Sequence, residues 1–190
     1  EYVSAYVKGL ESQNICSTLK HFPGQGSSSG DTHQGSVDID SSISKLRQID
    51  FVPFVNGMDA GADFVMISHI SVSRVTETSE PASLSNLIMT TILREELNYS
   101  GLIITDAFDM ASITDKYSAG DAAVKSFEAG ADIILMPEDL PGAFDAVLKR
   151  VQSGKITEKR LNDTVQRILK LKFQKGIMTL EDTAQKKEAE

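Results

Sequence analysis

The chain alternates between short runs of continuous apolar residues and longer segments whose apolar residues recur at helical spacing. Four runs of the first kind occur, at residues 15–20, 60–68, 102–105 and 129–137. The second and fourth share the repeat Ala-Gly-Ala-Asp, followed by aliphatic residues. Continuous apolar runs of this length are typical of strands that are buried on both faces of a parallel sheet. The pattern therefore predicts four parallel strands.

Helical periodicity fills the segments around these strands. The predicted helices cover residues 2–10, 50–60, 85–97, 118–130, 141–153 and 157–175. Four of them begin at a residue type that favours helix starts: Asp50, with Pro53 in the first turn, Ser85, Ser118, in a capping box with Asp121, and Thr157. The chain therefore repeats a helix–strand unit four times and ends in one further helix.

Alternation at this spacing predicts a parallel α/β fold. An open doubly wound sheet and a (β/α)₈ barrel both satisfy it, although a complete barrel typically takes about 250 residues. Four units are half of eight, and the first helix begins without a capping residue or an initiator methionine. We therefore expect the C-terminal half of a TIM barrel, cut from a longer chain, with a catalytic domain at 1–178 and a polar tail at 179–190.

Composition narrows the possible partners. The 190 residues are 41% hydrophobic and 24% charged, which is typical of one globular domain. No stretch approaches about eighteen continuous apolar residues, so we predict no membrane span. The net charge of −8 argues against binding nucleic acid, which requires clustered Lys and Arg. The single Cys16 excludes an internal disulfide and a cysteine-based zinc site.

Ionisable side chains follow three of the four predicted strands. Lys20 and His21 end the first, His69 follows the second and Asp106 follows the third. Both candidate architectures place their active sites at the carboxyl ends of parallel strands. The remaining histidine, His33, lies in the loop after the first strand. We therefore expect all three histidines and Asp106 to meet at one rim of the sheet.

The loop at 20–35, KHFPGQGSSSGDTHQG, is rich in glycine and serine. Within it, Asp31 is placed to hold one ring nitrogen of His33, which would fix the tautomer and raise the basicity of the other nitrogen. A phosphate-binding glycine loop is disfavoured, because the glycine spacing differs from the dinucleotide pattern and no Gly-Lys-Ser/Thr follows. A solvated surface loop with a chance histidine stays open on this segment alone.

Two motifs in register resemble glycoside hydrolase family 3, in its bacterial β-N-acetylglucosaminidase branch. KHFPGQGSSSGDTH is similar to the family pattern K-H-F-P-G-H-G, four residues, then D-S/T-H. GLIITDAFDM is similar to its nucleophile segment, and MISH to the end of its sixth strand. Order and spacing agree from residue 1 to about 178. Gln25 departs from the usual histidine, and Ser27-Ser28 from the more common Asp-Thr.

This resemblance implies a (β/α)₈ barrel and a retaining glycosidase that needs no metal and no cofactor. It assigns Asp106 as the catalytic nucleophile and His33, partnered by Asp31, as the general acid/base. Three further residues of the rim would contact the aminosugar: Lys20, His21 and His69. Most retaining glycosidases use two carboxylates about 5–5.5 Å apart. Here the nearest second carboxylate, Asp109, is expected to cap the following turn, and a histidine takes the acid role.

Two alternatives remain at this stage. The first is a catalytically inactive half-barrel that pairs with a second copy of itself, because an open half-barrel exposes strand edges and apolar helix faces. The second is an aldolase that forms a Schiff base through Lys20. The aldolase hypothesis does not explain the segment from His21 to Gly24 or the segment around Asp106. The leading hypothesis is release of terminal β-linked N-acetylglucosamine through a covalent glycosyl-enzyme.

Overall fold

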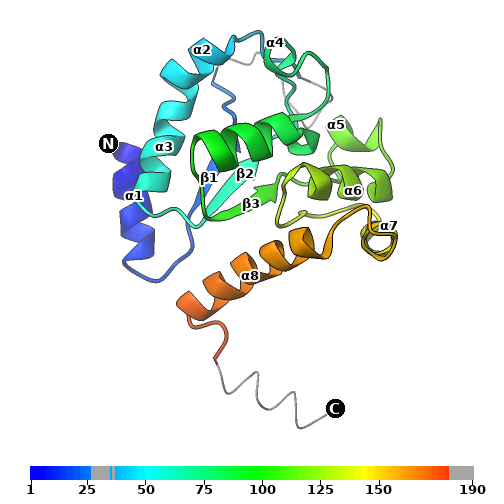
Figure 1. The fold of residues 1–190 in the computed structure, drawn as a ribbon. Helices are drawn as coiled ribbons and strands as arrows, with labels where there is room; N and C mark the ends of the chain where they lie inside the picture. Colours follow the sequence, from blue (N-terminus) through cyan, green and yellow to red (C-terminus); the bar gives the residue numbers. More distant parts are fainter. Residues whose placement is uncertain (27–34, 36, 180–190) are drawn as a thin grey trace.

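A computed structural model describes residues 1–26, 35 and 37–179 (Figure 1). Three parallel strands form one sheet in the order β1–β2–β3: β1 (Thr18–Phe22), β2 (Phe64–Ile67) and β3 (Leu102–Thr105). A parallel bridge between Ile104 and Ile133 places the fourth predicted run beside β3, although that run is limited to this single bridge. The predicted parallel α/β class is confirmed.

Helices precede and follow each strand. In chain order they are α1 (Tyr2–Glu11), α2 (Ile43–Lys45), the π-helix η1 (Leu46–Asp50), α3 (Phe51–Asp59), α4 (Ser73–Thr76), the 3₁₀-helix η2 (Ala82–Leu84), the π-helix η3 (Leu87–Glu96), α5 (Ala111–Thr114), α6 (Ala119–Ala129), α7 (Leu140–Gln152) and α8 (Glu158–Gln174). In Figure 1, α1 and α3 flank the β1 side and α8 lies below the sheet. Within the described residues, no helix combines the length and apolar character needed to cross a membrane.

The predicted helix starts hold at three positions and fail at one. Ser85 accepts a hydrogen bond from the backbone N–H of Ile88 at 3.4 Å. Ser118 and Thr157 each accept a hydrogen bond from a backbone N–H three residues on, at 3.1 and 3.2 Å. The prediction for Asp50 is wrong, because the helix begins earlier, at Ile43. Its cap is Ser42, whose hydroxyl oxygen accepts from the Lys45 N–H. Residues 43–59 are continuously helical, so the first turn of α3 has no free N–H groups that need Asp50.

The main core lies between the sheet and the helices on the α3 and η3 side. Phe22 of β1 is fully buried and packs against two rings of α3, with centroid distances of 5.1 Å to Phe51 and 5.2 Å to Phe54. Val65 and Ile103 of the neighbouring strands are also fully buried in this cluster. Burial of these side chains fixes the strands against the helices, and thereby fixes where the strands end.

Helix α8 is attached to the amino ends of the strands by buried charges, and both Ala-Gly-Ala-Asp repeats take part. Asp63, from the first repeat, lies 2.8 Å from the ammonium of Lys175, just after α8. Asp132, from the second repeat, has a fully buried carboxylate that contacts Arg167 of α8 at 2.7 Å and Arg94 at 2.8 Å. In each repeat, the aspartate that precedes the apolar run pairs with a cationic side chain of α8 or of the residue just after it.

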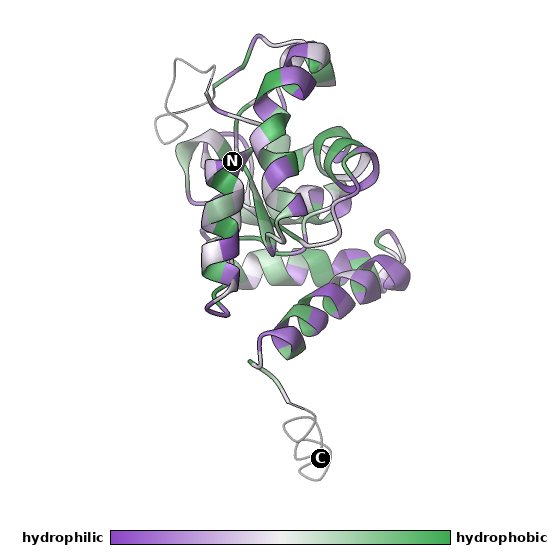
Figure 2. Ribbon diagram, turned by 90° about the vertical axis from the view of Figure 1, so that its left-hand side faces the viewer, coloured by the Kyte–Doolittle hydropathy of each residue, from purple (hydrophilic) through white to green (hydrophobic). Residues whose placement is uncertain are grey.

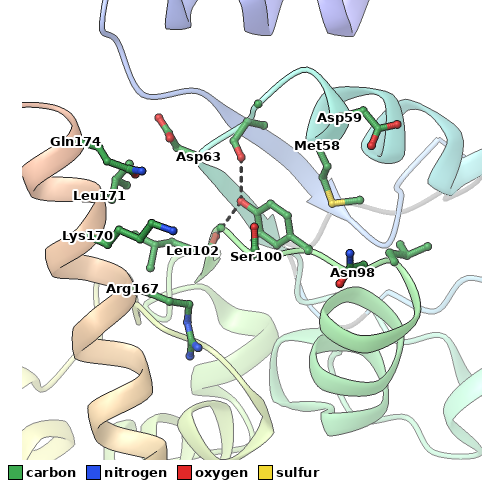
Figure 3. A pocket seen from close by; sticks show the side chains of 15 residues that line it. Met58, Asp59, Asp63, Asn98, Ser100, Leu102, Arg167, Lys170, Leu171 and Gln174 are labelled. Atoms are coloured by element: carbon green, nitrogen blue, oxygen red, sulfur yellow. Dashed lines mark hydrogen bonds between the residues drawn. The ribbon is translucent and has the colours of Figure 1, made fainter.

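A polar hollow of about 470 Å³ lies beside this attachment, between α8 and the segments that precede β2 and β3 (Figure 3). Figure 3 shows Arg167, Lys170 and Gln174 of α8 along one side and Asp63 across from them. The hollow opens at the amino ends of the strands. Asp106, which follows the last residue of β3, lies at the carboxyl ends and therefore at the opposite end of the sheet. The residues that follow the strands therefore lie at the end of the sheet away from this hollow.

Candidate active site

Two side chains that are 85 positions apart in the sequence meet where β1 and β3 end. The Nε2 atom of His21 lies 3.5 Å from the Oδ2 atom of Asp106, and both side chains are partly accessible to solvent, at 23% and 16%. Asp106 directly follows β3, and its backbone N–H donates to the carbonyl of Ile67 on β2 at 2.8 Å. The carboxylate therefore projects from the carboxyl edge of the sheet, next to an imidazole.

The position of His21 depends on an irregularity in β1. Leu19 pairs with Val65 and Phe22 pairs with Ile67, so two residues of β1 lie opposite the single Met66 of β2. An extra residue of this kind shifts the alternation of side chains, because a one-residue change in register exchanges the two faces of a strand. Leu19 and Phe22 consequently share the same core, and His21 is directed to the rim.

The chain turns back immediately after this strand. The N–H of Gly24 donates to the carbonyl of His21 at 2.9 Å, which closes a tight turn across Phe22-Pro23. Gly24 has a φ of +127°, and a β-carbon at this position would lie 2.9 Å from the β-carbon of Asp50. Only glycine satisfies both the backbone angle and the contact without displacement. This glycine lets the loop pass close to η1 while His21 stays at the rim.

The rotamer of Asp106 is supported by the next residue. Its Oδ1 atom accepts a hydrogen bond from the backbone N–H of Ala107 at 2.9 Å. The other oxygen, Oδ2, is the one that faces His21. A carboxylate with one oxygen held by the backbone and the other oxygen at the rim has a defined orientation. This is the geometry that a nucleophile or a charge-stabilising group requires.

His69 differs from the other rim residues because it is buried. Its ring is only 1% exposed, and both nitrogens have protein partners: Nδ1 lies 2.7 Å from the hydroxyl of Ser83, and Nε2 lies 2.8 Å from the carbonyl of Ala107. Burial lowers the pKa of His69, which favours the neutral ring. The structure thus places His69 directly behind the loop that carries Asp106 and uses both of its nitrogens within the protein.

The structure gives different outcomes for the other residues that the sequence analysis singled out. Lys20 is exposed, beside His21 in β1, whereas a Schiff-base lysine is activated by desolvation or by a neighbouring cation, so its position gives the aldolase no support. Asp31 and His33 lie outside the described residues, and so does the tail at 180–190. The cap of α5 is Met110, without a side-chain bond, so the prediction that Asp109 caps this turn is wrong.

Sequence reasoning missed the residues that hold this rim together. Ser83, Ala107 and Leu135 contribute through a buried hydroxyl or through backbone atoms, and neither periodicity nor motif spacing signals such contacts. Leu135 illustrates this: its N–H donates to the Thr105 hydroxyl oxygen at 3.0 Å, and its carbonyl accepts from the Phe108 N–H at 2.9 Å. The fourth run therefore braces the end of β3 on the side away from β2.

The fold and the rim together define a class of protein, namely a parallel α/β domain that presents a carboxylate and an imidazole where α/β enzymes bind their ligands. Comparison with known families gives the particular group. The sequence model of one family, described as the glycosyl hydrolase family 3 N terminal domain, matches residues 1–171. The chain therefore belongs to glycosyl hydrolase family 3.

Individual relatives agree with this membership. Beta-hexosaminidase A of Pseudoalteromonas piscicida is 35% identical over 190 residues, which cover 88% of this chain and 31% of that protein. Beta-hexosaminidase of Stenotrophomonas maltophilia (strain K279a) is 36% identical over 154 residues, covering 78% of this chain and 44% of that protein. The chain thus spans less than half of the length of these relatives.

Solved structures show the same similarity in three dimensions. A glycoside hydrolase family 3 beta-N-acetylglucosaminidase from Paenibacillus sp. str. FPU-7 matches with a TM-score of 0.88 and 34% identity, over 93% of this chain and 35% of that chain. A beta-glucoside phosphorylase, BglX, matches with a TM-score of 0.84 and 30% identity, over 92% of this chain and 33% of that chain. The scaffold is therefore similar to that of a protein named as a glucosaminidase and of one named as a phosphorylase.

Proposed function

We propose that the full-length protein is a retaining β-N-acetylhexosaminidase that releases terminal β-linked N-acetylglucosamine. The observation that carries this proposal is the meeting of Asp106 with His21 at the carboxyl edge of the sheet, 3.5 Å apart, in a member of glycosyl hydrolase family 3. The hexosaminidase names of the relatives favour an aminosugar substrate.

The proposed reaction has two steps. In the first, Asp106 attacks the anomeric carbon and forms a glycosyl ester, while His33, paired with Asp31, protonates the departing oxygen. In the second, the same imidazole removes a proton from water, and this water displaces the carboxylate with overall retention. His21 and Lys20 contact sugar hydroxyls, and His21 in addition lies against the carboxylate that becomes charged again in the second step.

We infer further that the described units form one half of a (β/α)₈ barrel. The edge of β1 that faces away from β2 borders a largely apolar hollow of about 460 Å³, lined by α1, α3 and β1. Tyr2 and Tyr6 of α1 line it and are 91% and 72% exposed, which is unusual for large side chains next to a sheet edge. A neighbouring strand and helix would cover this edge, supplying the rest of the sugar pocket.

A direct assay tests the proposed function. The full-length protein is expected to hydrolyse 4-nitrophenyl N-acetyl-β-glucosaminide with a kcat/KM at least about 100-fold above that for the matching β-glucoside, because the site would be built around the 2-acetamido group. Proton NMR should show the β-anomer of the free sugar as the first product. Preference for the glucoside would contradict the proposal, as would a sugar phosphate as the main product in phosphate buffer.

A second candidate concerns the 190-residue chain alone: we propose that it is inactive and associates with a second copy through the β1 edge. Figure 2 faces this side of the molecule and shows hydrophobic residues interspersed with hydrophilic ones along its helices. Sedimentation of the isolated chain should show a dimer whose fraction rises with concentration. Tyr6→Lys should shift it to monomer, while Ile49→Lys, at a residue that is 60% exposed against 72% for Tyr6 but lies outside the hollow, should not. A wild-type monomer at every concentration, or turnover by the isolated chain, would contradict this candidate.

A further inference from the structure

We propose that His69 is a positioning residue for Asp106: it fixes the peptide that follows the carboxylate and does not itself contact the sugar. This inference rests on the proposed function, because the catalytic role of Asp106 belongs to that proposal. Its own support comes from four hydrogen bonds around residues 106–108, which originate from three different parts of the chain.

The peptide unit between Ala107 and Phe108 is held at both of its polar ends. Its carbonyl oxygen, on Ala107, accepts from His69 Nε2 at 2.8 Å, and its N–H, on Phe108, donates to the carbonyl of Leu135 at 2.9 Å. A peptide unit is planar, so two bonds at opposite ends fix its orientation. His69 supplies the bond from the β2 side, and Leu135 supplies the bond from the far side of β3.

The preceding peptide unit carries the N–H that holds the carboxylate. The Ala107 N–H donates to Asp106 Oδ1 at 2.9 Å, and the Asp106 N–H is tied to the Ile67 carbonyl at 2.8 Å. Because the backbone is fixed before Asp106 by Ile67 and after Ala107 by His69, the direction of the Ala107 N–H is also fixed. The carboxylate rotamer follows, with Oδ2 toward His21. Without the His69 bond, the carbonyl of Ala107 would lose its partner and the loop could rotate.

The protonation of the His69 ring is set by the same contacts. A carbonyl oxygen only accepts, so Nε2 carries the hydrogen, and Nδ1 of the neutral ring then accepts from the hydroxyl of Ser83 at 2.7 Å. The ring also packs edge-on against Phe108, with the centroids 5.4 Å apart. With both nitrogens engaged and the side chain buried, His69 has no nitrogen to offer a hydroxyl group of the substrate.

Two amide substitutions separate the two ends of the ring. In His69→Gln, the amide nitrogen reaches the position of Nε2 and can donate to Ala107; in His69→Asn, the shorter amide reaches the position of Nδ1 and can contact only Ser83. Both variants lose the ring that packs against Phe108, and His69→Asn additionally loses one methylene group and the bond to Ala107. In the full-length protein, His69→Asn should lower kcat about 30-fold with KM nearly unchanged, while His69→Gln should stay within about fivefold of wild type.

The step that is affected can be isolated. With a 2,4-dinitrophenyl leaving group, departure needs little help from an acid, so the pre-steady-state burst reports attack by the carboxylate alone. The burst rate constant should fall in His69→Asn and recover in His69→Gln. The thermal midpoint of His69→Asn should be the lower of the two, because the Ala107 carbonyl then lacks its partner. The comparison is therefore made on kcat per folded molecule, which a purely structural role would leave unchanged.

Asp106→Asn, assayed in parallel, keeps this inference distinct from the function on which it rests. Full activity of Asp106→Asn would end the proposed function. If Asp106→Asn is inactive but the two His69 variants share the same kcat and burst rate, the proposed function stands and the positioning role of His69 is overturned.

Discussion

Asp106→Asn in the full-length protein is expected to lower kcat by about 10⁴-fold or more, because an amide cannot form the glycosyl ester on which the reaction depends. The substitution preserves the shape of the side chain, and the amide oxygen can still accept from the Ala107 N–H. The thermal midpoint should therefore stay close to that of wild type. Steady-state hydrolysis of the 4-nitrophenyl substrate and a thermal melt together measure both expectations.

Asp109→Asn is the matched control for this experiment. Asp109 lies three residues further on, is exposed, and is the nearest other carboxylate in this segment. Its substitution should leave kcat within about threefold of wild type, since an exposed side chain away from the reacting atoms adds little. If Asp109→Asn removed activity and Asp106→Asn did not, the nucleophile would have to be reassigned.

Asp132→Ala is expected to produce the largest loss of stability, about 3–5 kcal/mol in the free energy of unfolding, because breaking a buried ion pair leaves its partners uncompensated. The Asp132 carboxylate is fully buried and contacts Arg94 and Arg167, and it also accepts from the Ile103 N–H at 3.0 Å. Its removal would leave guanidinium groups facing one another and would release α8 from the sheet. Urea unfolding followed by circular dichroism measures the change.

Asp163→Ala tests whether burial is the cause. Asp163 also lies on α8 and pairs with Lys159 at 2.7 Å, but its side chain is 41% exposed and that of Lys159 is 83% exposed, so water replaces the lost partner. The urea midpoint of this variant should match wild type. Equal midpoints for Asp132→Ala and wild type would show that the buried cluster does not hold α8 in place.

Strand positions could be predicted from the sequence where the chain itself marks both ends of a strand. The run at 102–105 is found as predicted, because Gly101 precedes it and the polar Asp106 follows it. The first strand was predicted two residues early at its end, since His21 resembles a loop residue by polarity and the full burial of Phe22 depends on α3. The extra residue in β1 arises from pairing with β2, a contact that the local pattern does not contain.

The candidate site was predictable in its location but not in its supports. Parallel strands end at one edge, so the meeting of His21 with Asp106 follows from topology. The burial of His69 does not, because the partners of its ring come from η2 and from the loop after β3. The charged attachment of α8 did leave a signal: the same Asp stands in both Ala-Gly-Ala-Asp repeats, and α8 is rich in Arg and Lys.

The two ladders of the sheet have different continuity, and this has a consequence for the proposed reaction. The β2–β3 ladder pairs four consecutive residues without a gap, whereas the β1–β2 ladder is interrupted at Lys20 and His21. Asp106 therefore follows the regularly paired strands, and His21 lies in the segment of β1 that carries the extra residue. In the proposed reaction the carboxylate has to return to the same position after each turnover, and regular pairing of the strand that precedes it favours this. The carboxylate and the imidazole of the proposed site are thus carried by strands that differ in the regularity of their pairing.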